Sequence, residues 1–213
     1  MTSTSTFGLG AMMLGGKAEP AGRTGSERQA HDFYPTPEEA TLALLDAEWP
    51  HLLAVARHGG IWEPACGDGR LARVLERKGF KVIGTDLIYR GYGDRRRRDF
   101  LAEREPLARA IITNPPFQSD IVVDFIQQAL TLCPGYVAML LKATFFHAAE
   151  RQDLFRRYPP AMIYPLAWRL DFLGLGAPAL ECAWYVWRRR GPRLADRLPT
   201  YRPLMRPGKR KTA

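Results

Sequence analysis

A short segment in the middle of the chain combines an amide side chain with two prolines and an aromatic ring. Asn114-Pro115-Pro116-Phe117 directly follows the apolar run 110–113. An amide oxygen and a neighbouring backbone carbonyl can accept hydrogen bonds from both N–H groups of a planar amine, and the prolines keep the turn rigid. Phe117 offers a face on which an extruded base can stack. The segment therefore predicts a site that holds and activates an amino group such as that of adenine, and a tight turn with a buried ring is the structural alternative.

A loop with two glycines lies upstream of this segment. The sequence Glu63-Pro-Ala-Cys-Gly67-Asp-Gly69 follows one apolar run and opens a helical pattern. The glycines allow a tight turn and close approach of a ligand to the backbone. Asp86 ends the next apolar run, where a carboxylate can accept hydrogen bonds from both ribose hydroxyls of a nucleoside. These residues predict a nucleoside site, and a structural turn capped by Asp68 is the alternative.

The same loop matches the loose dinucleotide pattern G-x-G-x-x-A between Gly67 and Ala72. Glu63 distinguishes two possible ligands, because its carboxylate would repel a pyrophosphate placed over the turn. S-adenosylmethionine has no phosphate and carries an ammonium group, which a carboxylate attracts. We therefore interpret the loop as a site for S-adenosylmethionine rather than for NAD.

Short apolar runs alternate with helical patterns along the chain. The predicted strands cover 60–63, 81–86, 110–114 and 136–141, and the predicted helices cover 37–48, 70–78, 120–132 and 148–157. Such alternation indicates βαβ units in a mostly parallel α/β sheet. Ligands of these sheets bind beyond the carboxyl ends of the strands, which is where the residues singled out above are expected to lie.

Cysteine usage and apolar runs indicate the cellular location. Cys66, Cys133 and Cys182 show neither a metal-ligand spacing nor a disulfide pattern. No apolar run reaches the roughly 18 residues of a membrane span, and the first residues lack the pattern of a secretion signal. We therefore expect a cytoplasmic protein with no bound metal and no membrane partner.

Composition divides the chain into three parts. Residues 1–30 are rich in small and polar residues and predict a flexible arm, 31–190 predict one domain, and 191–213 predict a basic tail. The formal net charge of +9 favours a polyanionic partner such as DNA. The tail and the run Arg95–Arg98 can contact phosphates, and solvated charged surfaces are the alternative.

The ordered set of motifs resembles that of class I S-adenosylmethionine-dependent methyltransferases. More narrowly, it is similar to compact phage-type enzymes that methylate the N6 amino group of adenine in DNA. In this resemblance Asn114, Pro115, Pro116 and Phe117 form the catalytic motif, and Phe117 and Arg169 contact the target. The residues expected to bind the methyl donor are Tyr34, Thr36, Pro37, Glu63, Ala65, Gly67, Gly69, Asp86, Asp99 and Phe100.

The resemblance implies a single Rossmann-like domain of the α/β class. Its sheet would be mostly parallel and seven-stranded, with an antiparallel last strand and helices on both faces. S-adenosylmethionine would be the cofactor and DNA the partner of a monomer or homodimer. Specificity would come from the short loops 88–98, 144–151 and 168–179, since no separate recognition domain is inserted.

Other methyl acceptors also have a nitrogen whose lone pair is delocalised. A glutamine amide in a protein or a base in RNA also has a delocalised nitrogen lone pair, and both stay open as substrates. A non-catalytic nucleic-acid-binding relative is a further alternative, against which the intact Asn114, Phe117 and Asp86 argue.

Overall fold

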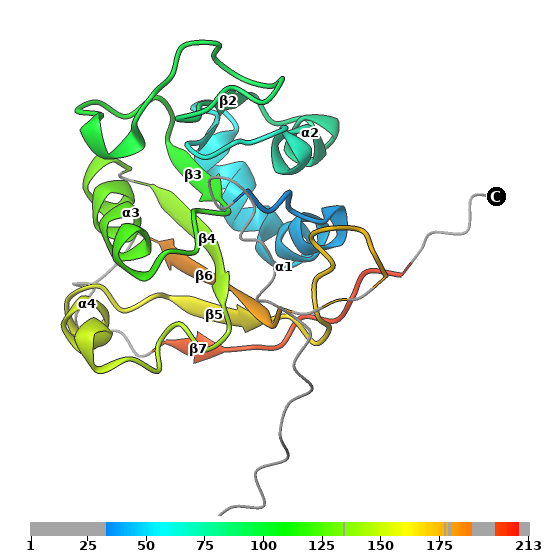
Figure 1. Ribbon diagram of the computed structural model, residues 1–213, viewed down its shortest axis with the longest axis vertical. Helices are drawn as coiled ribbons and strands as arrows, with labels where there is room; N and C mark the ends of the chain where they lie inside the picture. The colour runs from blue at the N-terminus through cyan, green and yellow to red at the C-terminus, as the bar shows by residue number, and fades with distance from the viewer. Residues whose placement is uncertain (1–32, 134, 177, 179, 189–198, 209–213) are drawn as a thin grey trace, which may run out of the picture.

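The computed structural model describes residues 33–133, 135–176, 178, 180–188 and 199–208. A central sheet lies between two helical layers (Figure 1). Helices α1 (Glu38–Ala56) and α2 (Arg70–Arg77) cover one face, and α3 (Ser119–Leu132) and α4 (Gln152–Arg157) cover the other. Short 3₁₀ turns cover Phe100–Ala102 (η1) and Ala149–Arg151 (η2). The predicted α/β class with helices on both faces is confirmed.

Seven strands form the sheet in the order β2-β1-β3-β4-β6-β5-β7. The strands are β1 (Ile61–Glu63), β2 (Val82–Gly84), β3 (Ala110–Thr113), β4 (Tyr136–Lys142), β5 (Met162–Pro165), β6 (Cys182–Arg188) and β7 (Thr200–Tyr201). β1 to β4 pair in parallel, whereas β6 runs antiparallel to both of its neighbours, β4 and β5. The predicted mostly parallel sheet is therefore confirmed, with β6 as the antiparallel last long strand.

Alternate residues of the central strands fill two separate cores. In β4, Tyr136, Ala138 and Leu140 pack with α1 and α2, whereas Val137 and Met139 pack with α3. Burial on both sides explains why the strand is apolar without interruption, because neither face of a covered parallel sheet meets water.

The observed elements differ from the predicted ones mainly near the chain ends. Helix α1 continues through Pro50 to Ala56, since Leu52 and Ala56 are buried beneath it. β7 comes from the segment predicted to be a basic tail, and Leu204 buries its side chain beside Leu166. Residues 199–208 therefore pack on the fold, whereas the predicted arm 1–30 lies outside the described residues. In the part of the chain that the structure describes, no helix has the length and apolar character needed to cross a membrane.

The chain reverses its direction of strand addition between β1 and β3. β2 lies on one side of β1 and β3 lies on the other, and all three strands are parallel. The loops after neighbouring strands diverge at such a point and leave a crevice at the carboxyl edge of the sheet. The candidate site lies at this edge.

Candidate active site

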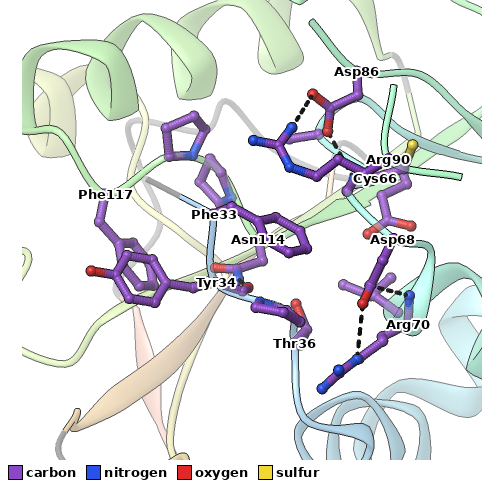
Figure 2. A pocket seen from close by; sticks show the side chains of 17 residues that line it. Phe33, Tyr34, Thr36, Cys66, Asp68, Arg70, Asp86, Arg90, Asn114 and Phe117 are labelled. Atoms are coloured by element: carbon purple, nitrogen blue, oxygen red, sulfur yellow. Dashed lines mark hydrogen bonds and ion pairs between the residues drawn. The ribbon is translucent and has the colours of Figure 1, made fainter. Parts of the chain in front are cut away.

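A pocket lies where the loops after β1, β2 and β3 meet the segment 33–36 (Figure 2). The space between its walls measures about 550 Å³ including the open mouth, within the range of small-ligand sites. Ten of the predicted site residues line it: Tyr34, Thr36, Glu63, Ala65, Gly67, Asp86, Asn114, Pro115, Pro116 and Phe117. The structure therefore brings together motifs that are far apart in the sequence.

Asp86 is fixed at the pocket wall by two backbone groups. Its Oδ2 accepts a hydrogen bond from the N–H of Gly67 at 2.8 Å, and its Oδ1 accepts one from the N–H of Ile88 at 2.9 Å. Arg90 Nη1 lies 3.8 Å from Oδ1. A carboxylate oxygen has capacity for more than one hydrogen bond, so Asp86 can still accept from ligand hydroxyls.

Glu63 is a buried carboxyl group with an unused acceptor. It ends β1, its side chain is 2% exposed, and its Oε2 has no hydrogen-bond partner among the described residues. Burial raises the pKa of Glu63 well above its usual range, the backbone N–H of Ala72 opposes this, and the charge of Asp86 adds to it. An ionised carboxylate in such a place is costly without a cation. The position therefore suits a ligand that brings a positive charge.

Asn114 presents an oriented, unpartnered oxygen to the pocket. Its Nδ2 donates to the carbonyl oxygen of Tyr34 at 2.9 Å. Because a carbonyl oxygen only accepts hydrogen bonds, this contact determines which end of the amide is the nitrogen. The other end, Oδ1, is buried and has no hydrogen-bond partner in the described part of the chain. Asn114 is thus prepared to accept a hydrogen bond from a ligand N–H.

Two aromatic rings, Tyr34 and Phe117, line one end of the site and pack against a third, Phe172, and we call these three residues the aromatic cluster. The rings of Tyr34 and Phe117 are stacked, with centroids 5.7 Å apart and planes 28° apart. Phe172 meets both edge-on, at 5.8 Å and 5.9 Å. Figure 2 shows Tyr34 and Phe117 at the opposite end of the pocket from Asp86 and Arg90. The site therefore has an aromatic half and a charged half.

Phe33 and Arg90 line the charged half and were not among the predicted site residues. The guanidinium carbon of Arg90 lies 4.6 Å from the ring centroid of Phe33. Phe33 also lies against Gly67, where a β-carbon would be 2.5 Å from its Cε2 atom. Phe33 adjoins a recognised motif and could have been found from it, whereas nothing in the sequence around Arg90 signals its role.

Cys66 lines the pocket but is unsuited to act as a nucleophile. Burial, and next the charge of Glu63, raise the pKa of its thiol to about 12. The thiolate is the reactive form of cysteine, so it is almost absent near neutral pH. Transfer through a cysteine intermediate therefore has no support in this pocket.

Asp99 and Phe100 lie outside the pocket. Asp99 caps η1, because its Oδ1 accepts a hydrogen bond from the N–H of Leu101 at 3.0 Å. Phe100 is 2% exposed and packs against Trp62 and Phe125 in the core. Apolar burial accounts for its position, and the donor-binding role expected for both residues stays a prediction that this pocket does not support.

Three more of the predicted site residues do not line the pocket. Pro37 precedes the first residue of α1, and Gly69 precedes α2 with a φ of 81°, facing the Tyr92 ring. Arg169 is exposed and forms an ion pair with Glu181 at 2.8 Å. The structure does not place Arg169 in the pocket, so its contact with a target stays a prediction.

Several solved structures have a similar fold, and methyltransferases are among them. A proposed class I S-adenosylmethionine-dependent methyltransferase from Listeria monocytogenes is 17% identical with a TM-score of 0.55, and the match covers 79% of this chain and 65% of that protein. A proposed RNA methyltransferase from Pyrococcus horikoshii is 14% identical with a TM-score of 0.58, covering 74% and 88%. The M protein of the type I restriction enzyme EcoKI is 17% identical with a TM-score of 0.52, covering 72% and 43%.

These likenesses concern the fold, since all three identities are low. The chain spans about two thirds of the Listeria protein and less than half of the EcoKI M protein. No family model and no curated protein sequence matches the chain. The described residues nonetheless form a single α/β domain with the fold of class I methyltransferases.

Proposed function

We propose that this protein transfers a methyl group from S-adenosylmethionine to the N6 amino group of adenine in DNA. The observation that carries the proposal is the buried Oδ1 of Asn114, which has no partner among the described residues and whose direction is determined by the contact of Nδ2 with the Tyr34 carbonyl. The lone pair of an adenine amino group is delocalised into the ring. An acceptor that takes a hydrogen bond from the amine favours a tetrahedral nitrogen with its lone pair available for attack.

The charged half of the pocket fits the methyl donor. S-adenosylmethionine, when bound, supplies an electrophilic methyl group on a sulfonium sulfur. Glu63 would hold the ammonium group of its methionine part, and this is supported by its Oε2, which no other described residue contacts through a hydrogen bond. Asp86 would accept hydrogen bonds from the ribose hydroxyls, because its position is already fixed by two backbone N–H groups.

The aromatic half fits the acceptor base. The aromatic cluster offers π-surface for stacking immediately beside Asn114, since Tyr34 supplies both a ring to the cluster and the carbonyl that orients the amide. Stacking would hold the base so that its amino group meets Oδ1. Such positioning, rather than a protein nucleophile, would supply most of the rate acceleration.

Charge supports DNA as the substrate. A net charge of +9 suits a polyanion, and the EcoKI M protein, with a similar fold, belongs to a restriction enzyme. RNA is the second candidate, because the Pyrococcus protein with a similar fold is described as a proposed RNA methyltransferase. Asn114 does not distinguish an adenine in DNA from one in RNA, so the test offers both.

The test is transfer of a radiolabelled methyl group to unmethylated genomic DNA and, separately, to total RNA, followed by digestion to nucleosides. We expect label in N6-methyladenine from DNA. Asn114→Ala should lower the transfer rate at least 100-fold while the Kd for S-adenosylmethionine changes little, and Asp86→Ala should raise that Kd. Gln127→Ala removes an exposed amide on α3 and serves as the matched control. Label confined to RNA would reassign the substrate, and unimpaired transfer by Asn114→Ala would refute the catalytic assignment.

A further inference from the structure

Between β5 and β6, two residues far apart in the loop pair with each other. The N–H of Leu170 donates to the carbonyl oxygen of Leu180 at 3.1 Å, and Leu170 is 1% exposed. Arg169 and Glu181 form an ion pair next to this bridge. The base of the loop is thus anchored to the domain.

The tip, residues 171–176, has a shape set by one side chain. Asp171 accepts hydrogen bonds from the N–H groups of Leu175 at 3.2 Å and Gly176 at 2.7 Å. Gly174 and Gly176 have φ angles of 68° and 73°, a conformation that other residues rarely adopt. This closed turn leaves two apolar side chains in water, because Leu173 is 48% exposed and Leu175 is 76% exposed.

One side of the tip packs against two residues that line the candidate active site. Phe172 is 5% exposed and meets the rings of Tyr34 and Phe117. Its neighbours along the tip, Leu173 and Leu175, point instead to solvent. The same short turn therefore carries both a ring of the aromatic cluster and two exposed apolar side chains.

A target adenine in duplex DNA lies inside the base stack and is paired. To reach Asn114 it must leave the helix, and unstacking a base costs a few kcal/mol. Apolar side chains that insert between bases offset this cost in other DNA-bending and minor-groove proteins. An apolar side chain on a preformed turn beside the base-binding cluster has the position and chemistry for that insertion.

We propose that the tip 171–176 is a wedge that enters duplex DNA when the target base is extruded, with Leu175 filling the space that the base leaves. This inference rests on the proposed function, and it names duplex DNA as the form of the substrate that the site is built to open. The net charge of +9 favours association of the protein with the phosphate backbone, and the wedge acts only on a base that is stacked and paired.

The test compares methyl transfer to duplex genomic DNA with transfer to the same DNA after heat denaturation and rapid cooling. Leu175→Ala shortens the wedge at an exposed position, so folding is unaffected. We expect its rate on duplex DNA to fall about 10- to 30-fold and its rate on denatured DNA to fall less than about threefold. Met205→Ala removes an apolar side chain of the same 76% exposure on another segment and should leave both rates unchanged.

The ratio of the two rates decides the inference, because a structural defect would lower both together. The wedge would be overturned if Leu175→Ala transferred methyl groups at the wild-type rate, or if its rate fell equally on duplex and denatured DNA. Either result would point to a different role for the apolar tip, such as a protein contact. Wild-type transfer to denatured DNA alone would also overturn it while leaving the proposed function standing. Failure of the wild type to label either form would instead refute the proposed function, and the wedge with it.

Discussion

The substitution Glu63→Gln tests the donor half of the site without removing a side chain. The amide has the shape of the carboxyl group but cannot carry a negative charge. Glu63 is 2% exposed, its Oε2 has no partner among the described residues, and its backbone contact is with the N–H of Ala72. Without a ligand, the carboxylate therefore contributes little to the stability of the folded protein, whereas a bound cationic ligand would form a buried ion pair with it.

The expected loss of affinity follows from this burial. Removing one partner of a buried, hydrogen-bonded charge pair costs about 2–5 kcal/mol. We expect the Kd of Glu63→Gln for S-adenosylmethionine to rise about 100-fold, which corresponds to about 2.7 kcal/mol. Isothermal titration calorimetry measures this change directly. If the Glu63→Gln variant bound the donor within about threefold of the wild-type affinity, Glu63 would not be the group that holds the ammonium.

Proton release on donor binding gives an independent measure of the proposed contact between Glu63 and the ammonium group. Burial raises the pKa of Glu63 in the free protein, and a bound ammonium group would favour the ionised form. Donor binding should therefore release a proton below the raised pKa, and affinity should increase as the pH rises toward it. Titrations in two buffers of different ionisation enthalpy measure the release, which Glu63→Gln should abolish.

The stability of the free protein should respond to pH in the opposite direction. Because the pKa of Glu63 is raised by folding, the folded state holds a proton that the unfolded chain releases above a pH of about 4.3. The free energy of unfolding should therefore decrease as the pH rises from that value through the raised pKa. In Glu63→Gln this contribution should disappear, and the variant should be at least as stable as the wild type near neutral pH.

Glu48 provides the matched control, because it is the other glutamate that the described residues bury completely. Its side chain is 0% exposed and accepts hydrogen bonds from the Tyr164 hydroxyl at 2.5 Å and from the guanidinium of Arg188. Glu48→Gln weakens a satisfied network away from the pocket, so it should lower the free energy of unfolding by about 1.5–3 kcal/mol with an unchanged Kd for the donor. The reverse pattern, with Glu48→Gln affecting binding and Glu63→Gln only stability, would refute the reasoning.

Two further predictions concern the glycine loop and the thiols. Gly69→Ala should lower the free energy of unfolding by about 2 kcal/mol in urea denaturation, because φ is 81° and the new β-carbon would be 2.2 Å from the Tyr92 ring. Gly79 also has a positive φ, but a β-carbon there would meet no atom within 4 Å. A Gly79→Ala variant therefore measures the backbone strain without the clash. Cys66 and Cys182, whose pKa values burial raises to about 12, should resist alkylation at pH 8 until the protein is unfolded. Rapid labelling of either thiol in the folded state would contradict their burial.

The sequence was sufficient to predict the architecture and most of the candidate site. Chemically distinctive residues stood at the ends of apolar runs, and in a parallel sheet those ends meet at one edge. Asp86 and Asn114 are cases of this rule, because each follows a strand and each lines the pocket. Their spacing along the chain therefore carried real spatial information.

Residues whose positions depend on packing were harder to predict. Phe100 was expected to bind the methyl donor, but its ring is buried in the core against Trp62. Phe172 joins the aromatic cluster through a loop with no recognisable motif, and Arg90 reaches Asp86 from the irregular segment after β2. An aromatic or basic residue in a loop is too common for its sequence context to indicate such a contact.

The orientation of Asn114 shows why a motif alone does not define the site. The Tyr34 carbonyl that accepts from Nδ2 is 80 residues away in the sequence, and it belongs to the segment whose Phe33 packs on the glycine loop. Any residue at position 34 would supply that carbonyl, but only the folded path of residues 33–36 brings it within 2.9 Å of the amide. The glycine loop and the Asn114 amide thus contact the same short segment. It follows that the orientation of Asn114 depends on this segment as much as on the Asn-Pro-Pro-Phe sequence itself.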